Sequence, residues 1–209
     1  MAEIEYFYAS YSGYAYLGSA RFYEIASAAG RKIIHRPVDL RKVVSVMAPS
    51  AFNKRSKAHI DYYFGREISR WSEFRNAPVV NGVPTHHNNS ITLSNCMLIA
   101  GIEQGHNIDA LAHAMLEGHW RDDADLADFD TLLKIGNSVG LDAKSLLDQA
   151  LSPEIQAIYQ ANTEEAIERS VFGSPTYFVD GDMFYGQDRL EMVERALQKP
   201  FKGNWPPAT

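Results

Sequence analysis

The stretch Tyr6-Phe7-Tyr8-Ala9-Ser10-Tyr11-Ser12-Gly13-Tyr14-Ala15-Tyr16-Leu17 joins an apolar strand to a helical pattern through a Ser-x-Ser-Gly turn. Ser10 and Ser12 are both suited to capping the helix that follows. A helix that begins here directs unpaired backbone N–H groups, and the positive end of its dipole, over the end of the strand. An anion would be stabilised at that point. The alternative is that one serine only caps the helix, as serines before helices commonly do.

The composition is that of a folded protein with a sizeable core, since 45% of the 209 residues are hydrophobic and 22% are charged. Twenty basic against 26 acidic residues give a net charge of −6 without a basic run, so nucleic acid is not an expected partner. The first residues do not resemble a secretory signal and no apolar run could span a bilayer, so we expect a cytoplasmic protein without a membrane partner. The single cysteine, Cys96, excludes an internal disulfide and a Cys-x-x-Cys pair.

Apolar and turn patterns predict the order of the elements. Aromatic and β-branched residues predict strands over 4–9 and 32–38, joined by a helix over 14–29, which together form a right-handed βαβ unit. Strand character returns at 176–179 and 183–185, joined by a turn at Asp180-Gly181-Asp182 and followed by a helix over 189–197. Between these halves the sequence predicts helices over 57–75, 90–104, 109–120, 130–139 and 152–169, a connector over 41–52 and a short turn over 143–150.

This order is the thioredoxin arrangement, and we predict an α/β thioredoxin-like fold with an all-helical insertion. The thioredoxin-like domain would comprise residues 1–45 and 170–205, and the insertion domain residues 46–169. The stretch Val171-Phe172-Gly173-Ser174-Pro175-Thr176 supports this, because a proline that enters a strand belongs at a bend or an edge. It resembles the thioredoxin superfamily, whose members carry a cis-proline here. The resemblance implies that the Ser174 backbone is free to pair with an extended ligand, whereas a trans proline at an ordinary strand edge is the alternative.

Four pieces of the chain, taken in order, resemble the kappa-class glutathione transferases and especially the 2-hydroxychromene-2-carboxylate isomerases of bacteria. The chain departs from that family at Gly13, where proline is usual, at Ala9, where an acidic residue is frequent, and at Glu67, where aspartate is usual. The resemblance nevertheless covers nearly the whole sequence. The four pieces are Ser12 after an aromatic strand, Tyr63 with Arg70-Trp71, the run Ala166–Thr176, and Phe184-Tyr185-Gly186-Gln187-Asp188-Arg189-Leu190.

The resemblance implies glutathione as the cofactor, held by Ser12, Ser174, Pro175, Gln187 and Asp188. Ser12 is the candidate catalytic residue, because a hydroxyl donor at a helix start lowers the pKa of a thiol from its free value near ~8.5. In the thioredoxin relatives that make disulfides a cysteine occupies this region. The Ser174 N–H and C=O would pair with the cysteinyl backbone of glutathione, and the γ-glutamyl end would lie against Gln187 and Asp188. Asp188 is equally suited to capping the last helix.

On the substrate side, Tyr11, Tyr63 and Trp71 could line an aromatic pocket, although aromatic residues at helical spacing also form cores. Lys57 is a candidate for binding a substrate carboxylate, with Arg70 and Arg75 also available, and a solvated helix face is the alternative. The adjacent histidines at 86 and 87 are interpreted as part of a polar loop. No metal site is expected, since no ligand spacing supported by carboxylates or cysteines is found among His35, His86, His87, His106, His113 and His119.

The resemblance implies a glutathione-dependent isomerase that converts 2-hydroxychromene-2-carboxylate, or a close aromatic analogue, to trans-o-hydroxybenzylidenepyruvate in aromatic hydrocarbon catabolism. Glutathione thiolate would add to a conjugated carbon of the ring-opened keto acid, the new single bond would rotate, and elimination would restore a trans alkene. A kappa-type glutathione transferase or peroxidase is the main alternative, and a non-catalytic thioredoxin-like binding module is the second. The expected partners are glutathione and a small aromatic carboxylate, and the family resemblance implies a homodimer.

Overall fold

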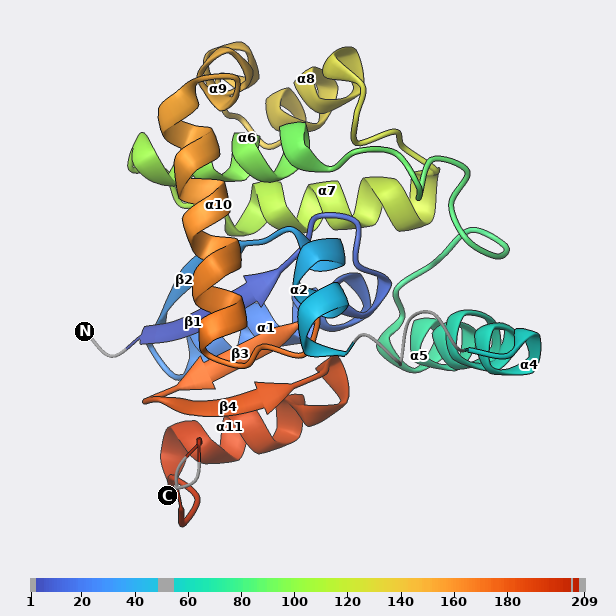
Figure 1. The fold of residues 1–209 in the computed structure, drawn as a ribbon, viewed down its shortest axis with the longest axis vertical. Helices are drawn as coiled ribbons and strands as arrows, with labels where there is room; N and C mark the ends of the chain where they lie inside the picture. The colour runs from blue at the N-terminus through green and yellow to red at the C-terminus, as the bar shows by residue number, and fades with distance from the viewer. Residues whose placement is uncertain (1–2, 49–54, 204, 207–209) are drawn as a thin grey trace.

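A computed structural model describes residues 3–48, 55–203 and 205–206, and shows a four-stranded sheet covered by helices (Figure 1). The strands are β1 (Glu3–Tyr8), β2 (Lys32–Pro37), β3 (Thr176–Val179) and β4 (Asp182–Tyr185). Their order in the sheet is β2-β1-β3-β4, with β1 parallel to β2 and antiparallel to β3. β3 and β4 form an antiparallel hairpin. The sheet therefore combines the predicted βαβ unit with the predicted ββα unit.

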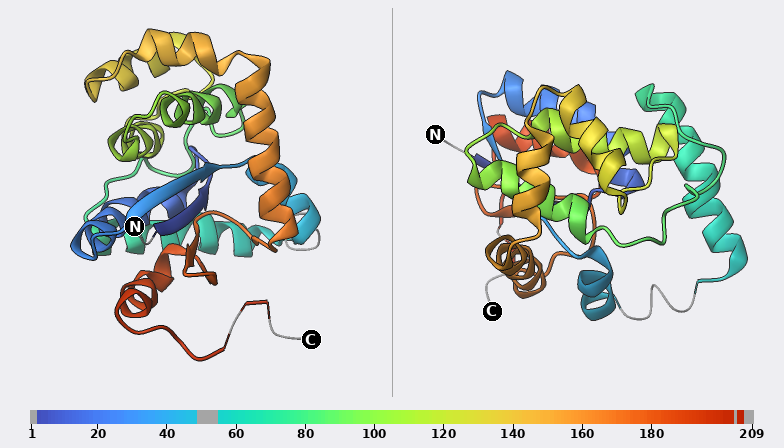
Figure 2. Two further views of the ribbon diagram at one scale, coloured as in Figure 1. Left: turned by 90° about the vertical axis from the view of Figure 1, so that its left-hand side faces the viewer. Right: turned by 90° about the horizontal axis from the view of Figure 1, so that it is seen from above.

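Helices cover both faces of the sheet, and a group of inserted helices lies above it in Figures 1 and 2. On the sheet lie α1 (Gly13–Ala28), α2 (Leu40–Met47), α10 (Pro153–Glu168) and α11 (Leu190–Gln198). A continuous helical run extends to one side and comprises α4 (Lys57–Ile60), a π-helical segment (Asp61–Arg66) and α5 (Glu67–Arg75). The group above the sheet comprises α6 (Thr92–Glu103), α7 (Asp109–Asp122), α8 (Phe129–Ser138) and α9 (Ala143–Ala150).

The central strand β1 is buried on both faces, which explains its continuous aromatic run. Successive residues of a strand point to opposite sides of the sheet. Tyr6 and Tyr8 therefore belong to the large core cluster with α1, α6 and α7. Phe7 belongs to a second cluster on the other face, with Val43 of α2 and Ala166 of α10. A strand with one solvent-facing side would need alternating polar residues instead.

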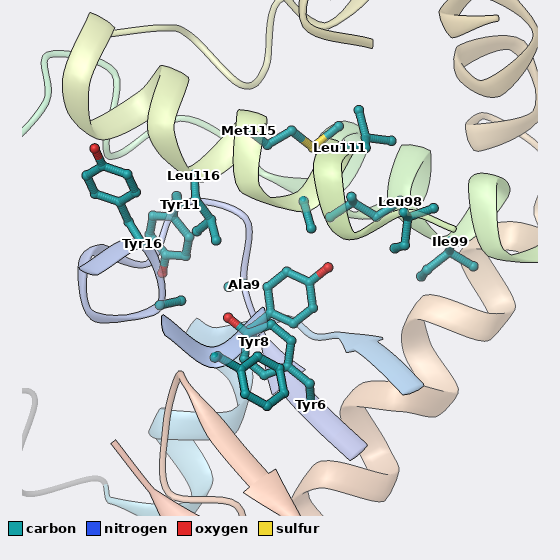
Figure 3. Close-up of a cluster of buried hydrophobic side chains, with 14 of the residues drawn as sticks. Tyr6, Tyr8, Ala9, Tyr11, Tyr16, Leu98, Ile99, Leu111, Met115 and Leu116 are labelled. Atoms are coloured by element: carbon teal, nitrogen blue, oxygen red, sulfur yellow. The ribbon is translucent and has the colours of Figure 1, made fainter. Parts of the chain in front are cut away.

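The large core continues from the sheet into the inserted helices (Figure 3). In that view Tyr8 lies beneath Leu111 and Met115 of α7, and Tyr11 lies beside Leu116 of the same helix. All five side chains are at most 6% exposed. The division into domains 1–45 with 170–205 and 46–169 stays a prediction, but the insertion shares its apolar core with the sheet.

Two short helices lie where the sequence patterns predicted none. α2 occupies most of the predicted connector over 41–52, of which residues 49–52 lie outside the described residues, and α9 occupies the predicted turn over 143–150. Each helix has eight residues, too few for the apolar period to stand out. The signal that could have found them is an N-cap: Asp39 accepts from the Lys42 N–H, and Asp142 accepts from the Ser145 N–H.

The first residue of α1, Gly13, has no room for a side chain. A Cβ atom there would lie 2.6 Å from Cζ2 of Trp120, whose indole N–H donates to the Tyr11 carbonyl oxygen at 2.8 Å. We expect Gly13→Ala to lower the free energy of unfolding by about 1–3 kcal/mol, the usual cost of overpacking, measured by urea denaturation. Gly65→Ala is the control, because a Cβ at Gly65 meets nothing within 4 Å. Equal stabilities of the two variants would contradict the clash with Trp120.

Candidate functional site

The turn between β1 and α1 is held by side chains from two inserted helices. Asn95 of α6 accepts from the Ser10 N–H at 3.1 Å, and the Ser10 and Ser94 hydroxyl oxygens are 2.8 Å apart. Trp120 of α7 donates to the Tyr11 carbonyl oxygen. All five residues are at most 6% exposed, so these hydrogen bonds replace water for groups that no helix or sheet pairs. The start of α1 is thereby fixed in position.

The same turn contacts the loop before β3, in which the Ser174–Pro175 peptide bond is cis, as predicted. The Ala9 N–H donates to the Ser174 hydroxyl oxygen at 3.2 Å. The Ser12 hydroxyl donates to the Ser174 carbonyl oxygen at 3.1 Å and accepts from the Ala15 N–H at 3.3 Å. Ser12 is therefore both the N-cap of α1 and a neighbour of the cis-proline loop. The Ser174 carbonyl oxygen accepts from Ser12 in this structure, and the pairing of the Ser174 backbone with a ligand stays a prediction.

Two cavities meet beside this contact. The larger, of about 510 Å³, lies between the start of α1, α2, the helical run from α4 to α5 and the cis-proline loop. The smaller, of about 240 Å³, lies between α5 and the turn that follows β4. Tyr14, Tyr63, Ser174 and Tyr185 line both cavities and so form their shared boundary. Ser12 and Gly13 line the larger cavity at this boundary.

The structure distributes the predicted site residues between the two cavities. The larger is lined by Tyr11, Ser12, Tyr63 and Ser174, and the smaller by Tyr63, Trp71, Ser174, Gln187 and Asp188. Trp71 therefore lies with the predicted cofactor residues and not in the larger aromatic cavity. Pro175 lines neither cavity, and its carbonyl oxygen accepts from the Gly186 N–H at 2.9 Å.

The structure does not place Lys57 at either cavity, contrary to its predicted role at the substrate. Its ammonium lies 2.5 Å from a carboxylate oxygen of Asp61, on a side chain that is 87% exposed. Arg70 and Arg75 also form ion pairs and line neither cavity. The error arose because neighbouring positions on a helix surface cannot be assigned to a cavity or to solvent from spacing alone.

Two other arginines, Arg41 and Arg55, line the larger cavity. The Arg41 guanidinium lies 5.6 Å from the Tyr11 ring centroid, and that of Arg55 lies 5.3 Å from the Tyr63 ring centroid. Sequence reasoning missed them, because Arg41 fell in the predicted connector and Arg55 just before the predicted helix. No local signal distinguishes them from other surface arginines. They give an otherwise aromatic cavity positive charge.

Asp188 and Gln187 both line the smaller cavity with polar side chains. Asp188 does not cap α11, so the capping alternative was wrong; its carboxylate pairs with Arg189 at 2.9 Å and is 44% exposed. Gln187 is 1% exposed. Its side-chain oxygen accepts from Nε of Arg75 at 3.5 Å, but its side-chain nitrogen has no acceptor among the described residues. A buried donor without an acceptor is rare in native structures, and this one belongs to a residue that lines the smaller cavity.

Burial sets the protonation state of the groups that line the cavities. It raises the pKa of the Tyr11, Tyr63 and Tyr185 phenols, so all three are neutral at pH 7 and able to donate hydrogen bonds. Burial, with smaller contributions from His119 and Arg41, lowers the pKa of His87 to about 4. His87 is therefore a neutral imidazole at pH 7.

The described residues hold no group of three or more histidine, cysteine, aspartate or glutamate side chains placed to bind a metal ion. Within that same part of the chain, no helix is both long and apolar enough to cross a membrane.

Comparison with known proteins identifies the fold family. A family description, the DsbA-like thioredoxin domain, matches residues 3–198. The chain belongs to the DsbA-like thioredoxin family. It is 27% identical over 208 residues to the 2-hydroxychromene-2-carboxylate isomerase of Pseudomonas putida, covering 96% of this chain and 97% of that protein. It is also 28% identical over 96 residues to glutathione S-transferase kappa 1 of Homo sapiens, covering 43% of this chain and 42% of that protein.

A solved structure of 2-hydroxychromene-2-carboxylate isomerase matches with a TM-score of 0.75 at 24% identity, covering 94% of both chains. The predicted thioredoxin-like fold is therefore confirmed, and so is the resemblance to the isomerases. This member of the DsbA-like family has Ser12 at the helix start, and its single cysteine lies elsewhere, in α6.

The thiol of this DsbA-like protein, Cys96, is buried at 1% exposure, and burial raises its pKa to about 11. Because only a thiolate reacts readily, we expect iodoacetamide at pH 8 to leave native Cys96 unmodified and to label it after unfolding in urea. Mass spectrometry of the intact protein measures this. We expect Cys96→Ala to cost about 1 kcal/mol, as a small core truncation does. Rapid labelling of the native protein would contradict an inert thiol.

Proposed function

We propose that this protein is a glutathione-dependent isomerase that converts 2-hydroxychromene-2-carboxylate, or a close aromatic analogue, to trans-o-hydroxybenzylidenepyruvate. The single observation that carries the proposal is the junction of two cavities of different character beside Ser12 and the start of α1. The smaller has polar and charged walls, and the larger has aromatic walls with two arginines. The full-length similarity to the isomerase of Pseudomonas putida supports the same reaction.

The residues of the smaller cavity fit the γ-glutamyl end of glutathione, which carries an ammonium and a carboxylate. Asp188 and Glu67, which pair with Arg189 and Arg70, would offer their carboxylate oxygens to the ammonium. The buried Gln187 amide, which lacks an acceptor among the described residues, can donate to a carboxylate oxygen. An unsatisfied buried donor costs about 1–3 kcal/mol, and a bound carboxylate would recover that cost.

Ser12 and Ser174 would bind the cysteinyl part of glutathione. The Ser174 carbonyl oxygen now accepts from the Ser12 hydroxyl, and the cysteinyl N–H of the ligand would take over this acceptor. The Ser12 hydroxyl is then released to donate to the sulfur, while its oxygen continues to accept from the Ala15 N–H. Both the hydroxyl and the positive end of the α1 dipole favour the thiolate over the thiol.

The larger cavity fits a flat aromatic carboxylate. Its volume of about 510 Å³ is within the usual range for small-molecule sites. Tyr11, Tyr63 and Trp120 provide aromatic walls, and Arg41 and Arg55 provide positive charge for the carboxylate. Bound glutathione would supply a thiolate that adds reversibly to a conjugated carbon, which permits rotation about the former double bond. The cavity walls would hold the aromatic ring and exclude water during that rotation.

A kappa-type glutathione transferase or peroxidase is the alternative, favoured by the partial match to the human kappa-class enzyme. The same Ser12 and the same two cavities would serve it, but the thiolate would be consumed by an electrophile.

We further propose that the protein acts as a homodimer in the cytoplasm. The strongly exposed Phe74 of α5 offers apolar surface for such an interface.

The decisive experiment combines the purified protein with 2-hydroxychromene-2-carboxylate and a limiting amount of glutathione. We expect many turnovers to the trans product per glutathione, with the total glutathione unchanged, measured by liquid chromatography. In the binary complex, ultraviolet absorbance should show thiolate below the free thiol pKa of about 8.5. Stoichiometric loss of glutathione would instead favour the transferase. Absence of glutathione binding would favour a non-catalytic thioredoxin-like module.

Ser12→Ala removes the proposed donor to the thiolate without leaving a core cavity. We expect turnover to fall by about 10²–10³, comparable to the loss of an oxyanion donor, because the thiolate loses its hydroxyl partner. We expect the free energy of unfolding to fall by only about 1 kcal/mol, the value of an N-cap. Steady-state kinetics and urea denaturation measure the two effects. Full activity at pH 7 would restrict Ser12 to capping.

A further inference from the structure

His87 is a titratable residue of the larger cavity to which the proposed function assigns no role. His87 lies in the loop before α6, and its ring lines the cavity wall. Its centroid is 4.8 Å from that of Tyr11 and 5.4 Å from that of Trp120, the two residues joined by a hydrogen bond at the start of α1. A sequence interpretation of His87 as part of a polar loop gave no reason to place it beside the site.

The hydrogen bonds behind His87 determine which of its nitrogens carries the proton. His119 Nδ1 lies 2.9 Å from the Ala124 carbonyl oxygen, which can only accept, so His119 Nδ1 carries a hydrogen. The Nε2 atom of neutral His119 is then an acceptor, and it lies 3.0 Å from His87 Nδ1. His87 Nδ1 therefore donates to it. This leaves Nε2 of His87 with a lone pair and with no hydrogen-bond partner among the described residues.

We propose that His87 is a catalytic acid–base residue that opens the chromene ring, with His119 as the residue that positions it. This assignment rests on the proposed function and names the group that acts before the thiolate. Ring opening needs a proton to leave one oxygen and a proton to reach another. A neutral imidazole with a fixed tautomer on the wall of the cavity is suited to both transfers.

A single proton accounts for both transfers, from the substrate to His87 and from His87 back to the substrate. His87 Nε2 takes the proton from the hydroxyl group on carbon 2 of the chromene, and the electron pair of that O–H bond forms the ketone. The bond between carbon 2 and the ring oxygen breaks, and its electron pair stays on that oxygen as a phenolate. The imidazolium then returns the same proton to the phenolate, which gives the phenol of the open keto acid. No oxidant, reductant or second reactant is needed.

Arg41 connects substrate binding to this step. Its guanidinium donates to the His87 carbonyl oxygen at 3.1 Å and lies over the Tyr11 ring. The carboxylate of the substrate is attached to carbon 2, the atom that also carries the hydroxyl group and the ring oxygen. A carboxylate bound to Arg41 therefore brings both reacting oxygens near His87. Its negative charge also offsets Arg41 and raises the His87 pKa toward neutrality, where an acid–base group is most effective.

The test uses two substrates that differ in the ring. The cis isomer of benzylidenepyruvate has no phenol, cannot form a ring, and needs only the thiolate-dependent rotation. We expect His87→Gln to lower turnover of the chromene by at least about 10² and turnover of the cis acyclic substrate by less than about threefold. His86→Gln is the matched control, because His86 is the adjacent residue, lies near Asp125 and lines neither cavity. It should turn over both substrates at the rate of the unchanged protein.

Equal losses on both substrates, or no loss on the chromene, would overturn the assignment of His87 and leave the proposed isomerase intact. If the unchanged protein isomerises neither substrate with glutathione, the proposed function fails and this assignment fails with it.

A second measurement needs no turnover. In ¹⁵N-labelled protein without ligands, imidazole correlation spectra at pH 7 should show hydrogen on Nδ1 of both His87 and His119. Hydrogen on His87 Nε2 would overturn the proposal.

Discussion

The structure depends on satisfying the backbone of the turn between β1 and α1. This turn is buried, and its N–H and C=O groups lie outside both the sheet ladder and the helix, so each needs a partner. Asn95, Trp120 and Ser174 supply them from α6, α7 and the cis-proline loop. Leaving one buried group unpaired costs about 1–3 kcal/mol. The inserted helices and the loop before β3 are thereby tied to one turn, and of the residues involved Tyr11, Trp120 and Ser174 line the larger cavity.

The sequence predicted what local patterns determine. The aromatic run of β1 and the turn signals predicted the βαβ and ββα units, and the resemblance to the thioredoxin superfamily implied the cis bond at Ser174–Pro175. The patterns could not reveal α2, because eight residues show too little periodicity, nor that Arg41 on it would reach the cavity. Lys57 was assigned wrongly for the same reason, since the direction of a surface side chain depends on tertiary packing. The partner of His87 is 32 residues away, and no spacing rule links the two.

The two cavities differ in charge in a way that separates two tasks. The smaller one places Glu67 and Asp188 near an amide that lacks an acceptor, a combination that suits a zwitterion. The larger one combines arginines with tyrosines whose pKa values are raised by burial, so it offers positive charge and neutral donors. An anionic aromatic molecule is therefore favoured in the larger cavity and disfavoured beside the carboxylates. Under the proposed function, this difference in charge would help to place the two ligands on either side of Ser12.

The π-helical segment Asp61–Arg66 has a consequence for how this protein can change. Such a segment is an extra residue accommodated within a helix, so a residue can be gained or lost there while the helix beyond it keeps its packing. Ile60, Tyr63 and Phe64, in or next to this segment, line the larger cavity, and Tyr63 lines the smaller one as well. Trp71 lies about two turns beyond Phe64 in α5, against the smaller cavity. A residue gained or lost in this segment would therefore reshape the wall of the larger cavity and the boundary that Tyr63 forms between the two. Under the proposed function, the range of aromatic substrates could change over evolution through this segment, while Gln187 and Asp188, which come from the turn after β4, keep their place at the smaller cavity.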